Sequence, residues 1–271
     1  MTAHILDALR AAGLEPVKHD LVLDGRIHRY RVVGDRAGSM NGWYTGHLSP
    51  VASAIFGSWK TGQTETWRAE ADKALSPAER AEHRRQFEAM RRQRAEEEVQ
   101  VRESARAKAA RLWALARPAD AAHPYLMAKR VKAWGIRQLR ESLVIPVRNV
   151  AGQLHSLQFI GADGDKRFLT GGRLKACYCP IGRPVDTLLL AEGYATAATV
   201  YEATGHATAC AFNAGNLAPV ARALRSKFPT LRIVICADND IATPGNPGLT
   251  KAWEAARAVQ GWVAVPTFES A

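Results

Sequence analysis

The chain has 271 residues, 47% hydrophobic and 23% charged, which is close to ordinary globular usage and excludes wholesale disorder and collagen-like repetition. No apolar run approaches the roughly 20 residues that span a bilayer, and four cysteines give no disulfide framework. We therefore expect a cytoplasmic protein without a secretory signal or membrane contact. The net charge of +11 favours a polyanionic partner.

The excess positive charge is concentrated in one part of the chain. Residues 129–183 contain eleven basic side chains and three acidic ones. Residues 186–268, by contrast, contain six of each. A local excess of this size predicts a defined surface for an anionic ligand, rather than a basic coat over the whole molecule.

Residues 1–67 are expected to form a small α+β domain. A helix is predicted at 5–12, and aromatic and β-branched residues between glycine-containing turns predict three antiparallel strands, at 26–34, 41–49 and 54–62. The segment contains no cysteine, and its histidines (His4, His19, His28 and His47) lack a tight ligand spacing. Structural or surface positions are therefore favoured for these histidines over a zinc site.

Residues 68–128 are expected to form a charged helical linker. Ser76 can cap a helix, Pro77 suits its first turn, and Glu79 completes a capping box, so a long helix is predicted from Ser76 to about Ala116. The segment is rich in Ala, Glu and Arg, which is typical of a solvated helix. A nucleic-acid arm is the alternative. A second, short helix is predicted at 123–131.

Residues 129–185 are expected to form a small basic β-rich subdomain. Short β-rich runs alternate with Gly, Asn and Asp turns over residues 142–180. Cys177 and Cys179 lie two residues apart, on one face of a strand. Since no second cysteine pair is available, packing is favoured over metal binding for both.

Residues 186–268 have the clearest order. Apolar runs at 187–191, 207–213, 231–237 and 262–266 alternate with helical segments at 194–204, 217–228 and 248–260. This alternation predicts an α/β domain with a parallel sheet that is flanked by helices and buried on both faces.

Acidic residues follow two of these predicted strands. Glu192 comes directly after the first strand, and Asp238 and Asp240 follow the third. Ligand groups gather at the carboxyl ends of parallel strands. Two carboxylates about 4 Å apart repel by roughly 4 kcal/mol at an effective dielectric constant of 20, so three of them require a cation. Oxygen ligands favour Mg²⁺ or Mn²⁺. Helix caps or turn residues are the alternative reading of each acid alone.

These segments resemble a known family. The sequences AEGYATA, ADND and GNPGLTKA together resemble the Toprim domain, which DnaG-type bacterial primases share with topoisomerases and some nucleases. Upstream, LVIPVRNVAGQLHSLQFIG and KRFLTGGR resemble the basic RNA-polymerase-like subdomain of those primases. The opening RIHRYRV, NGWY and FGSWK resembles primase-like Toprim proteins of plasmids, phages and integrated mobile elements. The resemblance runs from about Gly25 to Pro266.

The resemblance implies a DNA primase, an enzyme that makes short RNA primers on single-stranded DNA by metal-dependent nucleotidyl transfer. It would serve replication or transfer of a bacterial mobile element, with ribonucleoside triphosphates as substrates and a replicative helicase as a further partner. Glu192, Asp238 and Asp240 would be both the catalytic residues and the ligands of Mg²⁺ or Mn²⁺. A single-stranded DNA-binding protein without polymerase activity and a Toprim nuclease are the alternatives.

The same resemblance suggests which basic residues hold template or triphosphate. They are expected to face the acidic crevice, unless they are merely solvated turn residues: Lys166, Arg167, Arg173 and Lys175, with Arg148 as a further candidate. Phe168 and Tyr178 could stack on bases, but core packing is favoured for both.

Two departures from the family pattern stand out. Replicative primases begin with a zinc ribbon, whereas residues 1–67 here have no cysteine, so no zinc is expected. Those primases also carry an Asp four residues after the first acidic residue, where this chain has Thr196. The expected domains are therefore 1–67, resembling a cysteine-less zinc-ribbon region, 68–128 as linker, 129–185 as basic subdomain, and 186–268 as Toprim catalytic domain.

Overall fold

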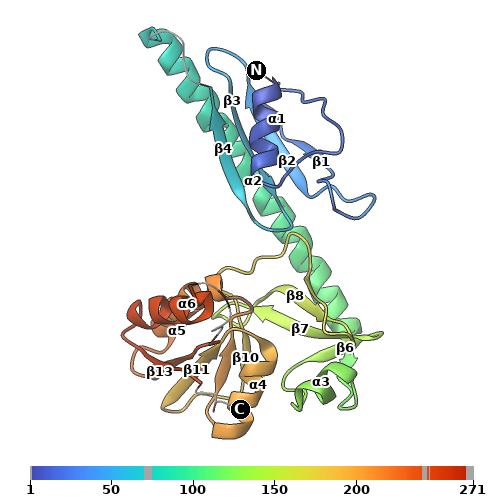
Figure 1. Ribbon diagram of the computed structural model, residues 1–271, viewed down its shortest axis with the longest axis vertical. Helices are drawn as coiled ribbons and strands as arrows, with labels where there is room; N and C mark the ends of the chain where they lie inside the picture. The colour runs from blue at the N-terminus through green and yellow to red at the C-terminus, as the bar shows by residue number, and fades with distance from the viewer. Residues whose placement is uncertain (1, 70–74, 240–242, 244, 267–271) are drawn as a thin grey trace. The chain divides into compact units, whose positions relative to one another are not determined.

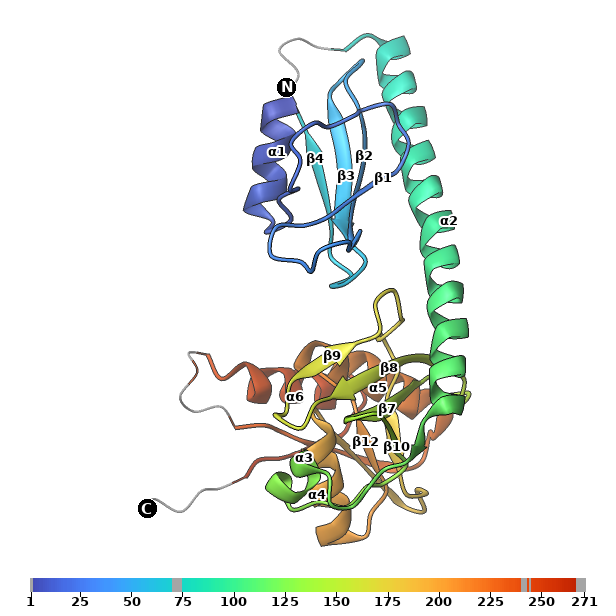
Figure 2. The same cartoon turned by 90° about the vertical axis from the view of Figure 1, so that its right-hand side faces the viewer.

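The computed structural model describes residues 2–69, 75–239, 243 and 245–266 (Figures 1 and 2). The chain divides into two compact units, Met1–Ser104 and Ala105–Ala271, so the boundary falls within one long helix. Among the helices of the described residues, none combines the length and apolar character that crossing a bilayer requires.

The first unit is a four-stranded antiparallel sheet between two helices. Helix α1 (Thr2–Ala11) covers one face, and the first part of α2 (Pro77–Leu115) covers the other, as Figure 2 shows. The strands pair in chain order: β1 (His28–Tyr30), β2 (Gly42–His47), β3 (Ser53–Ser58) and β4 (Thr64–Arg68). The predicted antiparallel sheet is confirmed. Strand β4 was not predicted, because it is an edge strand whose residues are mostly exposed and show no apolar alternation.

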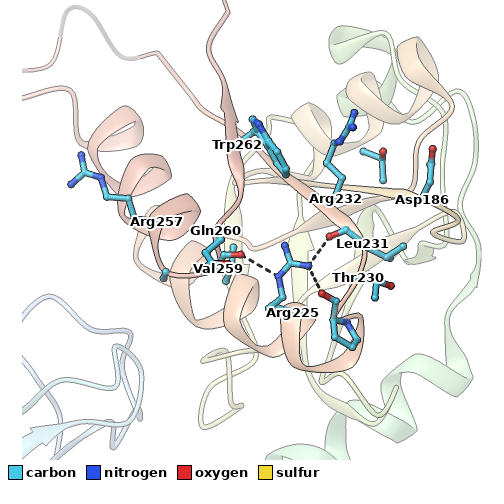
Figure 3. A pocket seen from close by; sticks show the side chains of 12 residues that line it. Asp186, Arg225, Thr230, Leu231, Arg232, Arg257, Val259, Gln260 and Trp262 are labelled. Carbon is cyan, nitrogen blue, oxygen red and sulfur yellow. Dashed lines mark hydrogen bonds between the residues drawn. The ribbon is translucent and has the colours of Figure 1, made fainter.

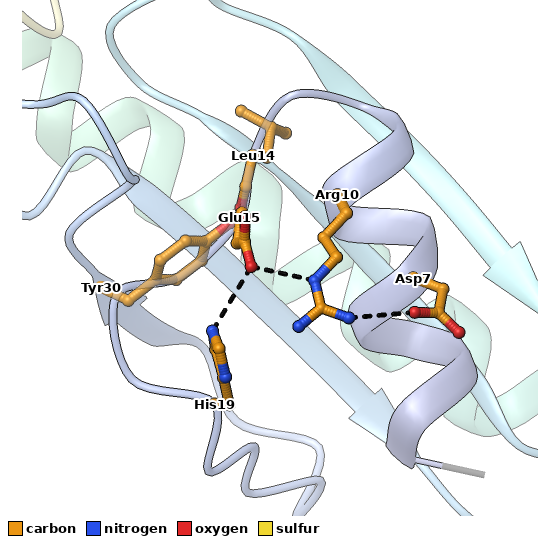
Figure 4. A network of polar contacts seen from close by, with 6 residues as sticks. All are labelled: Asp7, Arg10, Leu14, Glu15, His19 and Tyr30. Carbon is orange, nitrogen blue, oxygen red and sulfur yellow. Dashed lines mark hydrogen bonds and ion pairs between the residues drawn. The ribbon is translucent and has the colours of Figure 1, made fainter.

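A polar network fixes the end of α1 in this unit (Figure 4). Arg10 contacts Asp7 at 3.2 Å and Glu15 at 2.9 Å, and Glu15 in turn lies 3.4 Å from the His19 ring. The Tyr30 hydroxyl donates to the Leu14 carbonyl oxygen at 2.8 Å. His19 thus lies at the surface, in contact with a carboxylate.

Helix α2 begins with the expected capping box. The Ser76 hydroxyl accepts from the Glu79 amide, and the Glu79 carboxylate accepts from the Ser76 amide at 2.8 Å. The helix is more than a solvated linker, because each end contributes to a core. Met90 is fully buried against Trp43 and Ile55 of the first sheet. Ala109 is fully buried in the second unit.

The second unit begins with the basic β-rich subdomain. Its sheet is antiparallel, with strands in chain order: β5 (Arg117–Pro118), β6 (Arg137–Leu139), β7 (Ser142–Arg148), β8 (Leu154–Ile160) and β9 (Lys166–Phe168). The short helix α3 (Pro124–Lys129) precedes β6, as predicted. One face of the sheet, with Leu143 and Ile145, packs toward the C-terminal sheet. The other face, with Val144 and Phe159, packs against the last turns of α2.

The C-terminal sheet has the strand order β10-β12-β11-β13-β14. Its strands are β10 (Cys179–Ile181), β11 (Thr187–Ala191), β12 (Thr208–Cys210), β13 (Arg232–Cys236) and β14 (Trp262–Ala264). Helix α4 (Tyr194–Thr204) lies on one face, and α5 (Ala214–Lys227) and α6 (Pro247–Arg257) lie on the other. The predicted α/β fold, with a parallel sheet flanked by helices, is confirmed.

One strand differs from the expectation. Cys179–Ile181 was placed with the basic β unit, but it pairs antiparallel with β12 and makes the C-terminal sheet mixed. This pairing covers an edge of β12 that would otherwise expose backbone groups. Cys177 and Cys179 are both fully buried in the core between the two sheets, which confirms the predicted packing role. Phe168 and Tyr178 also pack against core clusters.

Candidate active site at the carboxyl edge of the parallel sheet

Strand register brings the acidic residues to one edge. Ala191, the last residue of β11, pairs with Cys210 of β12 on one side and with Cys236 of β13 on the other. Glu192 therefore follows the central strand, and Asp238 follows its neighbour two residues beyond Cys236. Both side chains belong to half-buried residues. Asp240 lies outside the described residues.

The pKa of the Cys210 thiol depends on the charges at this edge. Cys210 is fully buried, and its Sγ lies 3.3 Å from the Glu192 carbonyl oxygen. Burial raises the pKa of Cys210 to about 12, and the carboxylates of Glu192 and Asp238 add to the increase. Burial also raises the pKa of Cys236 to about 11, again with help from Asp238. Glu192 and Asp238 thus act on the same buried thiol, as expected for side chains that share one site.

Lys166 is brought to the same edge from the basic subdomain. Its ammonium lowers the pKa of Cys210, in opposition to the two carboxylates. Phe168, on the same face of β9, makes an edge-to-face contact with Phe212 at 5.8 Å between ring centroids. Phe212 comes just after β12, with a φ of 74°. The contact between these two rings therefore fixes the end of β9 beside the acidic edge.

The loop that carries Arg173 and Lys175 is tied to this edge by Asn216 of α5. The Asn216 amide nitrogen donates to the carbonyl oxygens of Leu174, Cys177 and Ala211, at 3.1, 2.9 and 2.8 Å. Its Oδ1 accepts from the Ala176 amide at 2.9 Å. Since Ala211 follows β12 directly, these bonds hold the loop at the carboxyl ends of the strands.

The start of this loop leaves no room for a side chain at Gly172. A Cβ there would lie 2.0 Å from the Ser156 hydroxyl of β8, so glycine is needed for the close approach. Next to it, the Nε of Arg173 is buried and makes no hydrogen bond to any residue that the structure describes.

Arg167 and Arg148 do not face the acidic edge, contrary to the expectation. Arg167 alternates with Lys166 on β9, and its guanidinium lies 6.0 Å from the Phe159 ring. Arg148 lies 5.7 Å from the ring of Trp113, and its Nη1 donates to the Gly152 carbonyl oxygen. Both rings belong to the core beneath the last turns of α2. The reason is the period of two along a strand, which sends neighbouring side chains to opposite faces.

Two positioning residues were missed by sequence reasoning. Asn216 is one, and Tyr194 at the start of α4 is the other. The buried Tyr194 hydroxyl accepts from the Trp134 amide at 2.7 Å, which ties the helix after Glu192 to the basic subdomain. A signal for Asn216 exists, since an asparagine among apolar helix residues must find partners once it is buried. The sequence contains no comparable signal for Tyr194, because an aromatic residue at this position reads as ordinary core.

The carboxylates fit a divalent cation of the Mg²⁺ or Mn²⁺ type. Both are hard oxygen donors, they come from adjacent strand ends, and their joint field reaches a thiol that stays protonated beneath them. Within the described ranges, no group of three or more His, Cys, Asp or Glu side chains could hold a metal ion. A third carboxylate would come from Asp240, outside those ranges. Thr196, in the first turn of α4, is half-buried.

Comparison with known proteins decides what this part of the chain is. Residues 187–269 match the sequence profile of the Toprim domain. This part of the chain is a Toprim domain. The match includes all four parallel strands, together with Glu192 and Asp238.

The similarity to curated proteins extends beyond the Toprim domain. The chain is 36% identical, over 281 residues, to a DNA primase TraC of Escherichia coli. The aligned region covers 98% of this chain and 19% of that protein. A second DNA primase TraC of Escherichia coli is 36% identical over 276 residues, covering 97% of the chain and 26% of that protein. The chain therefore spans about a fifth to a quarter of the length of these relatives.

Among solved structures, the chain is similar to the DnaG primase catalytic domain bound to single-stranded DNA. The alignment covers 59% of this chain and 67% of that chain, with 14% sequence identity. The TM-score is 0.41, which lies below the level at which a shared fold follows.

Proposed function

We propose that this chain is the polymerising part of a DNA primase, which joins ribonucleotides into short primers on single-stranded DNA. The observation that carries the proposal is the acidic edge of the Toprim domain, where Glu192 and Asp238 follow adjacent strands and act on the same thiol. The 36% identity to DNA primase TraC along nearly the whole chain supports the same activity.

Nucleotidyl transfer requires positioning and neutralisation of charge more than covalent chemistry by the protein. Glu192, Asp238 and Asp240 would hold Mg²⁺ or Mn²⁺, which neutralises phosphate charge and favours ionisation of the attacking 3′-hydroxyl. Lys166 lowers the pKa of the same thiol whose pKa these carboxylates raise, so it would contact the incoming triphosphate. Arg173 and Lys175, held at the same edge by Asn216, would contact phosphates of the template.

The partners follow from this activity. Single-stranded DNA is the template, ribonucleoside triphosphates are the substrates, and a replicative helicase is a further partner during replication or transfer of a mobile element. Such an enzyme works in the cytoplasm. In functional terms, residues 129–185 would guide the strands and residues 186–268 would carry the chemistry, while residues 68–128 would link both to a zinc-free domain at 1–67.

The test is a primer-synthesis assay. Single-stranded DNA is incubated with the protein, labelled ribonucleotides and Mn²⁺, and the products are resolved on a sequencing gel. We expect labelled RNA of several nucleotides with the wild-type protein. We expect none with Glu192→Gln, which keeps the size of the side chain but removes its charge.

The other outcomes of this assay are informative. A shortened template without labelled RNA would identify a nuclease, and an intact template that only shifts in a native gel would identify a binding protein. Glu254→Gln is the matched control, because Glu254 lies on α6 and pairs with Lys251 at 2.7 Å. Undiminished synthesis by Glu192→Gln would place the active site elsewhere.

A further inference from the structure

A polar cleft lies at the other end of the Toprim sheet, where β11, β13 and β14 begin (Figure 3). Its volume is about 770 Å³. That volume falls within the range of about 300–1,000 Å³ that is usual for small-molecule sites. We call it the amino-edge cleft and define it by Asp186, Arg225, Arg232, Arg257 and Trp262.

Arg225 provides a fixed cation in the wall of the cleft. Its Nε donates to the Val259 carbonyl oxygen at 3.1 Å, before β14. Its Nη1 donates to the carbonyl oxygens of Pro229 and Leu231, at 3.0 and 2.6 Å, before β13. Figure 3 shows the guanidinium held between these two loops. The Nη2 nitrogen makes no hydrogen bond within the described ranges, so a rigid donor remains for a ligand.

Arg232 and Trp262 form a stacked pair at the rim. The guanidinium carbon of Arg232 lies 5.5 Å from the ring centroid of Trp262. Trp262 is 56% exposed, an unusual position for so large an apolar ring. Arg232 makes no ion pair with a described residue. An exposed indole beside a guanidinium that has no carboxylate partner among the described residues is the combination that stacks on a nucleic-acid base and binds a phosphate.

The charge balance of the cleft selects an anion. Three guanidinium groups line it, from Arg225, Arg232 and Arg257, against the single carboxylate of Asp186. Asp186 is itself partly engaged, since its carboxylate lies 3.9 Å from the His206 ring. A cationic or purely apolar ligand would leave these groups uncompensated. An anion with a flat ring system would satisfy both the arginines and the tryptophan.

We propose that the amino-edge cleft binds a nucleotide unit, with its base against Trp262 and its phosphate on Arg225 and Arg232. The unit is either a free nucleoside phosphate or one nucleotide of a single strand. The cleft lies about 20 Å from the acidic edge, because Asp186 and Glu192 are six residues apart along an extended strand at about 3.3 Å each. It is therefore a second site, and it does not depend on primase activity.

The test measures binding without divalent metal, so that the acidic edge does not hold a triphosphate. Fluorescent ATP and a labelled twelve-nucleotide oligo(dT) are titrated in EDTA with wild type, Trp262→Ala and Arg232→Ala. The matched controls are Trp253→Ala and Arg222→Ala. Trp253 is also exposed, at 46%, and Arg222 is an exposed residue of α5, but neither lines the cleft. Thermal melting checks that each variant folds. Arg232→Lys is included as the variant that keeps the positive charge.

We expect Kd for at least one probe to rise about 10-fold or more with Trp262→Ala, in line with the loss of a stacked base. We expect a rise of about the same size with Arg232→Ala, in line with the loss of a hydrogen bond to a charged phosphate. The controls should stay within twofold of wild type. A loss of affinity for ATP identifies a free nucleotide as a ligand. A loss of affinity for oligo(dT) alone identifies one nucleotide of a single strand as the ligand. The oligonucleotide also contacts basic residues outside the cleft, so the Kd values of the cleft variants are compared with those of the control variants.

The proposal is overturned if both cleft variants bind both probes like wild type, or if the controls lose as much affinity as the cleft variants. A cleft that serves a protein partner would give the first of these results. Glu192→Gln should retain the binding seen in EDTA. If the primer-synthesis proposal fails, the proposal for the amino-edge cleft is therefore unaffected. If the cleft proposal fails, the primer-synthesis proposal is likewise unaffected.

Discussion

The two ends of the Toprim sheet carry opposite charge. At the carboxyl ends of β11 and β13, Glu192 and Asp238 form an acidic edge. At the amino ends of the same strands, Arg225 and Arg232 line a basic cleft. Between them, β11 is apolar and buried throughout, and after Arg232 the apolar residues of β13 alternate between buried and half-buried. One short sheet thus separates a site suited to a cation from one suited to an anion.

The two ends also differ in how their charges are stabilised. The arginines of the amino edge are held in place by neutral groups of the chain, namely backbone carbonyl oxygens around Arg225 and the indole of Trp262 beside Arg232. The carboxylates of the acidic edge raise the pKa of a buried thiol, with Lys166 acting in the opposite sense. The comparison therefore predicts that the acidic edge needs a metal ion for its function, whereas the amino edge does not.

The largest expected effect comes from removing charge at the acidic edge. Asp238→Asn should lower primer synthesis about 10²–10³-fold at fixed Mn²⁺, since a carboxylate that stabilises the transition state through the cation is lost. The activity should recover in part at higher Mn²⁺, which a titration of the metal measures. Glu254→Gln serves again as the control. An unchanged metal dependence would contradict the assignment of Asp238.

A smaller effect should separate two neighbours on β9. Lys166→Ala should reduce primer synthesis about 10- to 100-fold, corresponding to the loss of a hydrogen bond to a charged group. Arg167→Ala should leave synthesis near wild type, because the Arg167 guanidinium lies over Phe159 on the opposite face. Steady-state rates at varied ribonucleotide concentration measure both. Equal losses in the two variants would refute the division by face.

The next effect concerns the loop that borders the acidic edge. Asn216→Ala removes the side-chain amide that donates to the carbonyl oxygens of Leu174, Cys177 and Ala211, so each of these oxygens loses a donor. We expect a loss of about 1–3 kcal/mol in the free energy of unfolding, measured with urea. We also expect weaker template binding, because Arg173 and Lys175 lose their support.

Asn213→Ala is the matched control for this loop. Asn213 caps the same helix, α5, and its side-chain oxygen accepts from the backbone amide of Asn216 at 3.0 Å. Loss of the cap should cost about 1 kcal/mol without freeing the loop. Should Asn213→Ala weaken template binding as much as Asn216→Ala, the effect would come from the helix and not from the loop.

The sequence predicts much of this architecture for a physical reason. Buried parallel strands are apolar runs between amphipathic helices, so 187–191 and 231–237 stand out, and residues that follow them fall at one edge. The strand of Cys179–Ile181 could not be assigned in the same way, because pairing between distant segments leaves no local trace. The number of basic residues in a segment does not show which way each side chain points, and the period of two along β9 directs Arg167 away from the face that carries Lys166.

The smallest effect tests whether the acidic edge is as negative as the thiol of Cys210 indicates. Because the pKa of Cys210 is about 12 in the folded protein and near 8.5 in an unfolded chain, the folded state alone keeps this proton between those values. Its contribution to stability is complete below about pH 8.5 and is lost as the pH rises toward 12. The free energy of unfolding should therefore fall by up to about 1.4 kcal/mol per pH unit on account of this thiol.

Cys210→Ala should remove that part of the slope, which urea unfolding at several pH values between 9 and 11 measures. Glu192→Gln should reduce it only in part, since burial is the main cause of the shift and the carboxylate adds to it. An identical slope in wild type and Glu192→Gln would mean that the thiol does not sense the acidic edge, and the contrast between the two ends of the sheet would then rest on position alone.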